Sequence, residues 1–358
     1  MWKTAAMVLG APGFSPGLRL WRRGLAEGWA RGVLEVPAAG ETARLVAEKT
    51  RAPPPLRRFV ACPELARSVA AKLGSKGGSE GKEEEALFVE CEPGPGILTR
   101  TLLNAGARVI ALESNNSFLP NLESLKNKLD GQLEVVHCDF FRLDPINSGS
   151  IKPPVLYSEN LFENLGISAT AWTAGVPLKV VGIVPQKRER NVLWKLIYSL
   201  YERSSVYKYG RIELNLFVSE KEYKEPWSSF LTNSRNGGLS IPKSVLLQND
   251  HLCLVRMTPR KDLFTDNLTT VNSNIFIVIV KQCLAKGKTK LIDKLNLWSC
   301  ESGKKLLRQL EMPENITTGS LYPEQYKCLF ELMEQSNEFD QSWLYDDDCL
   351  EDNMGINI

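Results

Sequence analysis

The sequence predicts an α/β fold, in which a doubly wound, Rossmann-like parallel sheet precedes a small helical C-terminal domain. Three observations predict it. Short apolar segments alternate with amphipathic ones between residues 86 and 218, a glycine-rich turn follows the first of them, and an acidic residue closes each of the next two. Strands that alternate with helices indicate a parallel sheet whose two faces are covered by helices.

The expected strands are short apolar runs, as in strands buried on both faces, and the segments between them have one apolar face. Pro63 and Glu64 favour the start of a first helix. The expected strands cover residues 86–89, 108–112, 133–137, 177–184, 211–218 and 252–257, and the expected helices cover 63–73, 97–105, 118–129 and 191–201.

The last third of the chain has a different pattern, because helix-like segments follow one another there. An acidic stretch, 346–352, lies near the end. We therefore divide the chain into a leader and linker over 1–45, an α/β domain over 55–257 and a helical domain with an acidic tail over 258–358. The expected helices of the last domain lie at 272–285, 289–297, 303–310 and 323–336.

Composition excludes several classes of site. The net charge is +2, so any surface that binds nucleic acid must be local. The 8 cysteines include no C-x-x-C pair and only 2 histidines accompany them, so we predict no metal site. Scattered thiols suit a reducing compartment. The longest apolar run, 275–280, is too short to cross a bilayer, so no membrane partner is expected.

The first 26 residues contain no acidic side chain but do contain Lys3, Arg19, Arg22 and Arg23 among apolar residues. This acid-poor, arginine-containing pattern is typical of a mitochondrial transit peptide. A tail with no targeting role is the alternative.

A cofactor site is predicted where the expected strands end. Gly94 and Gly96 lie in the turn after the first strand, Glu113 ends the second strand and Asp139 follows the third. A glycine turn lets backbone approach a ligand, and strand-end carboxylates can accept ribose hydroxyls and an adenine amino group. Ordinary strand-end polar residues are the alternative. A nicotinamide cofactor is disfavoured, because Thr99 replaces the third glycine of its fingerprint.

Residues 88–99 resemble the E-x-G-P-G-x-G-x-L-T motif of the rRNA adenine N6-dimethyltransferases, and 109–113 and 137–140 continue the likeness in order. The resemblance implies a class I methyltransferase domain and S-adenosylmethionine as methyl donor. The donor-binding residues that it implies are Val60, Gly94, Gly96, Glu113 and Asp139.

Further stretches, 151–154, 177–182, 225–230 and 343–346, resemble the mitochondrial branch of this family, so the likeness covers roughly 55–352. Some members of that branch are transcription factors. The resemblance therefore implies a factor of the mitochondrial matrix and nucleoid that helps the mitochondrial RNA polymerase to melt promoter DNA. The mitochondrial HMG-box transcription factor and rRNA are further partners that it implies.

The family pattern is broken at three places. Glu92 replaces the first motif glycine, which we expect to weaken donor binding, and residues 58–60 replace a Q-N-F-L element. The methylation motif N-L-P followed by Tyr or Phe aligns with Ile183, Val184, Pro185 and Gln186. Isoleucine cannot orient an adenine amine and glutamine cannot stack on the base, so methylation should be weak or absent. No catalytic residue is assigned.

The chain is also shorter than the family near 221–226, where Lys221–Glu225 leads directly into Pro226. A helix and a strand are expected to be missing, which would expose a sheet edge.

Two basic clusters are candidate nucleic-acid contacts, because lysines and arginines bind phosphates without reading sequence. Solvated helix faces are the bland alternative. The first cluster comprises Lys187, Arg188 and Arg190, and the second comprises Lys281, Lys286, Lys288 and Lys290.

Two rival functions remain open. One is an active S-adenosylmethionine-dependent rRNA adenine N6,N6-dimethyltransferase of the mitochondrial small subunit rRNA. The other is a methyltransferase for a small molecule or a protein, which would need a substrate pocket near Pro185.

Overall fold

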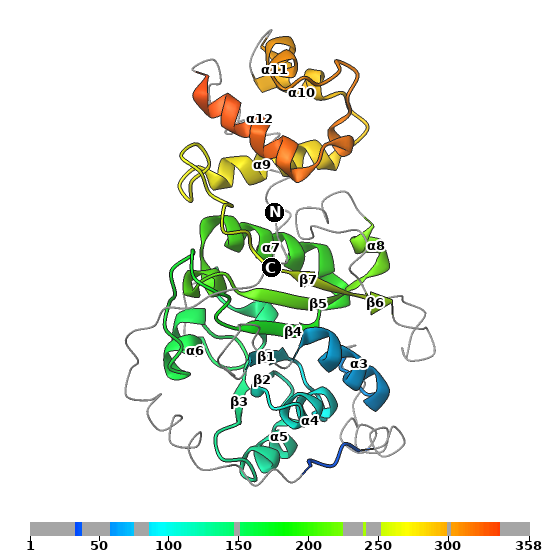
Figure 1. Ribbon diagram of the computed structural model, residues 1–358, viewed down its shortest axis with the longest axis vertical. Coiled ribbons are helices and arrows are strands. Elements are labelled where there is room, and N and C mark those ends of the chain that lie inside the picture. The colour runs from blue at the N-terminus through cyan, green and yellow to red at the C-terminus, as the bar shows by residue number, and fades with distance from the viewer. Residues whose placement is uncertain are drawn as a thin grey trace.

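The computed structural model describes residues 33–37, 58–74, 86–146, 151–224, 239–240, 252–298 and 302–336. Its centre is a 7-stranded sheet in the order β3-β2-β1-β4-β5-β7-β6 (Figure 1). The first five strands in the chain pair in parallel, whereas β7 runs antiparallel to β5. The strands are β1 (Leu87–Cys91), β2 (Arg108–Glu113), β3 (Leu133–His137), β4 (Lys179–Ile183), β5 (Glu213–Ser219), β6 (Leu239–Ser240) and β7 (Leu252–Met257).

Helices connect the parallel strands and cover both faces of the sheet (Figure 1). Those of the α/β part are α3 (Pro63–Leu73), α4 (Ile97–Asn104), α5 (Leu119–Lys126), α6 (Ser158–Asn164), α7 (Glu189–Glu202) and α8 (Glu220–Tyr223). Short 3-10 helices are η1 (Phe140–Arg142), η2 (Gln186–Arg188) and η3 (Ser205–Tyr209). The C-terminal part contains α9 (Ser273–Ala285), α10 (Leu291–Trp298), α11 (Gly303–Gln309), η6 (Thr318–Ser320) and α12 (Pro323–Gln335).

The sheet separates two apolar cores. Alternate residues of one strand enter different cores, so Phe88 of β1 packs with Val69 of α3 and Leu102 of α4, while Val89 packs with Leu193 of α7. A strand buried on both faces reads as a continuous apolar run, which explains why the strands were recognisable in the sequence. The predicted doubly wound α/β fold is confirmed.

The strand order places the predicted cofactor site. β1 lies between β2 and β4. The chain passes from β1 outward through β2 to β3, and then returns to add β4 and β5 on the other side of β1. In open α/β sheets this switch point leaves a crevice beyond the carboxyl ends of the strands. The glycine turn after β1, Glu113 at the end of β2 and Asp139 after β3 all lie at this edge.

The C-terminal helices share a core with the α/β part. Tyr201 of α7 and Phe276 of α9 are both fully buried, and their ring centroids are 5.2 Å apart. Phe276 in turn packs edge-on against Phe330 of α12. The helical part is therefore attached to the sheet through the helix that follows β4.

The structure contains one helix that the sequence analysis did not expect, and it describes the region of the expected shortening. Helix α6 was not expected, because its seven residues are too few to show an apolar period. The shortening expected near 221–226, with the loss of a helix and a strand of the family, stays a prediction. The one-turn helix α8 follows β5, and the two-residue strand β6 pairs with Leu254 and Cys253 of β7.

Other expectations fall outside the described residues. They concern the N-terminal 32 residues, the segment 225–230 and the acidic stretch 346–352. In the described part, no helix is long and apolar enough to cross a membrane.

Candidate methyl-donor site and acceptor edge

The turn after β1 requires glycine at two positions. Gly94 and Gly96 both have left-handed backbones, with φ of 58° and 81°. A Cβ atom at Gly94 would lie 2.6 Å from the ring of Phe59. Gly96 precedes the first residue of α4, so the turn delivers the chain directly into that helix. Left-handed backbone and close packing together explain both glycines.

Glu113 lies immediately beside this turn. Its side chain is buried, and its two carboxylate oxygens accept hydrogen bonds from the backbone N–H groups of Gly94 (2.9 Å) and Asn115 (2.7 Å). These bonds tie the end of β2 to the turn after β1. They also fix the carboxylate in place, as a group that accepts two ribose hydroxyls requires.

Asp139 occupies the corresponding place after β3. Its buried carboxylate caps η1 by accepting the N–H of Phe141 at 3.1 Å. Its own N–H donates to the carbonyl of Pro154 at 2.7 Å. The structure thus brings the glycine turn, Glu113 and Asp139 to one edge of the sheet, as the sequence predicts.

Val60 belongs to the same neighbourhood. It is buried in the core on the α3–α4 face, and Phe59 beside it lies under Gly94 and packs edge-on against Phe118. The segment that replaces the family's Q-N-F-L element therefore supports the glycine turn through apolar contacts.

Glu92 departs from the family in a position that favours glycine, because its φ is 55°. Its Oε2 accepts hydrogen bonds from the hydroxyl (2.9 Å) and N–H (3.4 Å) of Ser114, the residue after Glu113. A third carboxylate therefore joins Glu113 and Asp139 at this edge. It adds negative charge beside the predicted donor-binding residues.

A buried acid that sequence reasoning missed lies beneath the turn. Glu90 in β1 is 3% exposed and accepts a hydrogen bond from the Thr99 hydroxyl of α4 at 2.7 Å. Burial raises the pKa of Glu90 to about 7, and the Thr99 bond opposes this rise only in part. Glu90 is the first residue of the stretch that resembles the E-x-G-P-G motif. Only the structure shows that the Glu90 side chain faces α4 rather than the crevice.

The acceptor edge lies at the ends of β4 and β5. Ile183 is the last residue of β4 and pairs with Phe217, and Val184 is buried and donates its N–H to the Phe217 carbonyl at 3.0 Å. Pro185 and Gln186 are exposed. The motif predicted to be degenerate therefore lies at the carboxyl end of β4, the strand next to β1 and its glycine turn.

Charged side chains close this acceptor edge. The buried carboxylate of Glu189 accepts the N–H of Ser219 at 2.6 Å, and burial raises its pKa. Arg190 forms an ion pair with Glu222 of α8 at 3.0 Å. These contacts join the start of α7 to the end of β5, so Arg190 already has an intramolecular partner.

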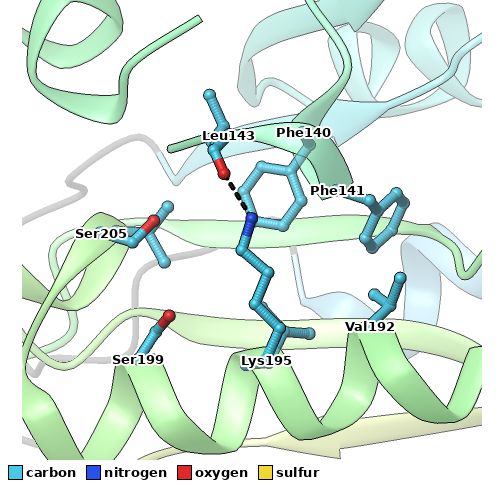
Figure 2. Close-up of a pocket in the computed structure, with 9 residues that line it drawn as sticks. Phe140, Phe141, Leu143, Val192, Lys195, Ser199 and Ser205 are labelled. Carbon is cyan, nitrogen blue, oxygen red and sulfur yellow. Dashed lines mark hydrogen bonds between the residues drawn. The ribbon is translucent and has the colours of Figure 1, made fainter. Parts of the chain in front are cut away.

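A small pocket lies between η1 and α7 (Figure 2). Lys195 points from α7 across it and donates to the Leu143 carbonyl. Burial lowers the pKa of Lys195, while the carboxylates of Asp144 and Asp139 oppose this effect. The cavity volume is about 20 Å³, enough for roughly one water and far too small for a nucleotide base.

The predicted basic residues are placed in two separate regions. Lys187 and Arg188 are exposed on η2, beside the acceptor edge. Lys281 is half-buried on α9, and Lys286, Lys288 and Lys290 are exposed in the turn that follows this helix. Within the described residues, no group of three or more His, Cys, Asp or Glu side chains could hold a metal ion.

The chain is similar to known proteins over most of its length. Residues 59–225 match the family model described as ribosomal RNA adenine dimethylase. The mouse protein dimethyladenosine transferase 2, mitochondrial, is 42% identical, over 82% of this chain and 81% of that protein. Its human counterpart is 44% identical, over 74% of this chain and 75% of that protein.

Among solved structures, the 23S rRNA methyltransferase ErmE is similar with a TM-score of 0.48 and 15% identity, covering 76% of this chain and 98% of its own. A dimethyladenosine transferase from Plasmodium falciparum has a TM-score of 0.46 and 13% identity, covering 76% of this chain and 96% of its own. The family model and the mitochondrial relatives carry the assignment. The chain belongs to the ribosomal RNA adenine dimethylase family, in the branch of mitochondrial dimethyladenosine transferase 2, and its cofactor is the predicted S-adenosylmethionine.

Proposed function

We propose that this protein is a mitochondrial transcription initiation factor built on a methyltransferase scaffold. It would work in the matrix, at the nucleoid, with the mitochondrial RNA polymerase, and would stabilise melted promoter DNA. Its methylation activity would be weak or absent. The mitochondrial location is supported by the leader-like pattern of the first 26 residues and by relatives whose names include the word mitochondrial.

One observation carries this proposal: among the described residues, the stretch that aligns with the family's methylation motif has isoleucine in place of the motif asparagine and glutamine in place of the aromatic residue. Methylation of an amine depends mainly on positioning, which needs a hydrogen-bond acceptor and a stacking ring. Ile183 supplies no side-chain hydrogen bond and Gln186 supplies no ring. The donor edge nevertheless retains Glu113 and Asp139 in buried, hydrogen-bonded positions.

The lysine turn after α9 supports contact with nucleic acid. Lys286, Lys288 and Lys290 are exposed, and the backbone that carries them is held by neighbouring backbone. The N–H groups of Thr318 and Gly319 donate to the carbonyls of Thr289 and Gly287, at 2.9 and 2.8 Å. A cation on fixed backbone loses less conformational entropy when it contacts a phosphate.

Reconstituted run-off transcription tests the proposal. Mitochondrial RNA polymerase and a promoter fragment are combined with and without the full chain, and with the mitochondrial HMG-box factor as a separate addition. The proposal expects a chain-dependent transcript. Absence of a transcript, from a chain that shows a cooperative thermal melt, would contradict it.

A charge-reversal pair sharpens this test. The double variant Lys286→Glu/Lys288→Glu should bind promoter DNA more weakly and should show a shallower dependence of affinity on salt, because fewer counterions are released. Lys72→Glu/Lys128→Glu, at exposed positions of the α/β part, is the matched control and should behave as the unsubstituted chain does. Equal losses in both variants would mean that the effect is only one of net charge.

Active rRNA dimethylation is the second candidate, because the donor edge is retained and the curated relatives are named dimethyladenosine transferases. It predicts transfer of labelled methyl groups to a small-subunit rRNA hairpin. The remaining candidate, methylation of a small molecule or protein, needs a pocket at Pro185. The small pocket of Figure 2 is lined by other residues and lends it no support.

A further inference from the structure

A short segment from the predicted leader and linker region contacts the outer face of α4. Residues 33–37 lie beside the α/β part (Figure 1). The Asn104 side chain accepts the N–H of Leu34 at 2.8 Å and donates to the Leu34 carbonyl at 2.9 Å. Arg100, one turn earlier on α4, donates to the Glu35 carbonyl at 3.4 Å. All three bonds reach backbone atoms of the segment.

The side chains of the segment alternate in their environment. Leu34 and Val36 are half-buried and pack against the core on the α3–α4 face, whereas Val33 and Glu35 are exposed. A period of two is the pattern of extended chain with one face against a protein surface. Main-chain hydrogen bonds with pockets for alternate side chains are a known way to hold an extended peptide.

The contact has consequences for the donor site, because α4 begins directly after Gly96. The inner face of α4 supplies Ile97 and Leu102 to the core. Its outer face is held by the segment through Arg100 and Asn104. The helix that follows the glycine turn is therefore fixed on two sides.

We propose that Val33–Pro37 is a strap, retained in the mature protein, and that removal of the leader therefore occurs before Val33. The strap lies within the region 1–45 that the sequence analysis assigns to leader and linker, and on this proposal it belongs to the linker. The inference that the leader is cleaved before Val33 rests on the proposed mitochondrial location. The docking of the strap on α4 does not depend on that location.

The mature N-terminus tests the processing limit. The full-length precursor is expressed in cultured cells, recovered from purified mitochondria, and its N-terminal peptide is identified by mass spectrometry. The expected first residue is at or before Val33. A mature chain that begins at any later residue has lost part of the strap and would overturn the inference. Failure of the precursor to enter mitochondria would instead count against the proposed location.

Hydrogen exchange tests the docking independently of import. In the full chain, the amide of Leu34 donates to Asn104, so its exchange should slow by roughly tenfold relative to the Asn104→Ala variant. Asn127→Ala, at an exposed position at the end of α5, is the matched control and should leave Leu34 protected. Asn104 is exposed, so its replacement should not prevent folding.

Two outcomes of this experiment are decisive. If the Leu34 amide exchanges at the rate of an unprotected peptide in the unsubstituted chain, the strap does not dock. If it is protected equally in the Asn104→Ala chain, α4 does not hold it. Either result overturns the proposal, and protection that depends on Asn104 bears it out.

Discussion

At the ends of β1, β2 and β3, functional side chains converge on a glycine turn, whereas at the ends of β4 and β5 charged side chains pair with one another. Glu113 bonds to the N–H of Gly94 on the donor side. On the acceptor side, Arg190 pairs with Glu222 and Glu189 bonds to Ser219. One sheet edge therefore contains a predicted donor half, built around a glycine turn and strand-end acids, and a predicted acceptor half in which charged side chains pair with one another.

The difference shows which half of a methyltransferase site can persist without the other. Backbone shape and strand-end acids hold the donor, and both also stabilise the sheet, as the buried Glu113 does by tying β2 to the turn. In the acceptor motif, Ile183 and Val184 belong to the sheet and its core, whereas Pro185 and Gln186 are exposed. If methylation is weak or absent, as proposed, the acceptor half is the part of the site that is freer to change.

The largest effect is expected at the glycine turn. In Gly94→Ala, the left-handed backbone costs about 1–2 kcal/mol and the overlap with Phe59 about 1–3 kcal/mol, so the free energy of unfolding should fall by about 2–5 kcal/mol. Gly74→Ala has a similar φ but open space around the new Cβ, so only the backbone cost should appear. Denaturant unfolding of both variants measures the difference. Equal losses would show that Phe59 does not constrain the turn.

The next effect depends on pH. The folded state raises the pKa of Glu90 from 4.5 to about 7, so the stability that its protonated form provides is full below pH 4.5 and is lost as pH rises toward about 7. The loss amounts to about 3 kcal/mol at most. Glu90→Gln should abolish this decline, while Glu163→Gln at an exposed position should keep it. Thermal melts between pH 5 and 8 give the comparison, and parallel curves for all three proteins would refute the assignment.

A smaller effect separates the two halves directly. Glu113→Gln should reduce the affinity for S-adenosylmethionine by about tenfold, because loss of a hydrogen bond to a charged group changes the binding free energy by about that factor. Gln186→Ala, on the acceptor side, should leave the affinity unchanged. Isothermal titration measures both, with a melt to confirm folding. A loss of donor affinity in Gln186→Ala would mean that the halves are not independent.

The smallest effect concerns Glu92. In Glu92→Gly, relief of the left-handed backbone should offset the lost bonds to Ser114, so stability should change by less than about 1 kcal/mol. Donor affinity should rise severalfold, because one carboxylate leaves the site. Glu92→Gln, which removes only the charge, separates the two contributions. Unchanged affinity in both variants would show that Glu92 does not repel the donor.

Much of the fold was predictable because strands buried on both faces are continuous apolar runs. The expected strand 252–257 and helices at 63–73 and 303–310 agree with β7, α3 and α11 to within one residue. That the predicted donor residues lie together was predictable for a related reason: the carboxyl ends of consecutive parallel strands meet at one edge of the sheet. The resemblance then attached a donor to them.

The remaining features depend on contacts between residues far apart in the chain. Leu34 bonds to Asn104 across 70 positions, and Arg190 pairs with Glu222 across 32. A local pattern contains no information on either contact. Glu90 looked like part of a ligand motif, and only the packing of α4 on β1 shows that it bonds to Thr99.

The most direct test of the central claim is run-off transcription with the donor half disabled. The Glu113→Gln chain, checked by its melt, is assayed beside the unsubstituted chain, with and without S-adenosylmethionine. The account predicts the same amount of transcript in all four reactions, because the scaffold and not methyl transfer supports initiation. A transcript that requires the donor, or that disappears with Glu113→Gln, would contradict it and would return the protein to the methyltransferases.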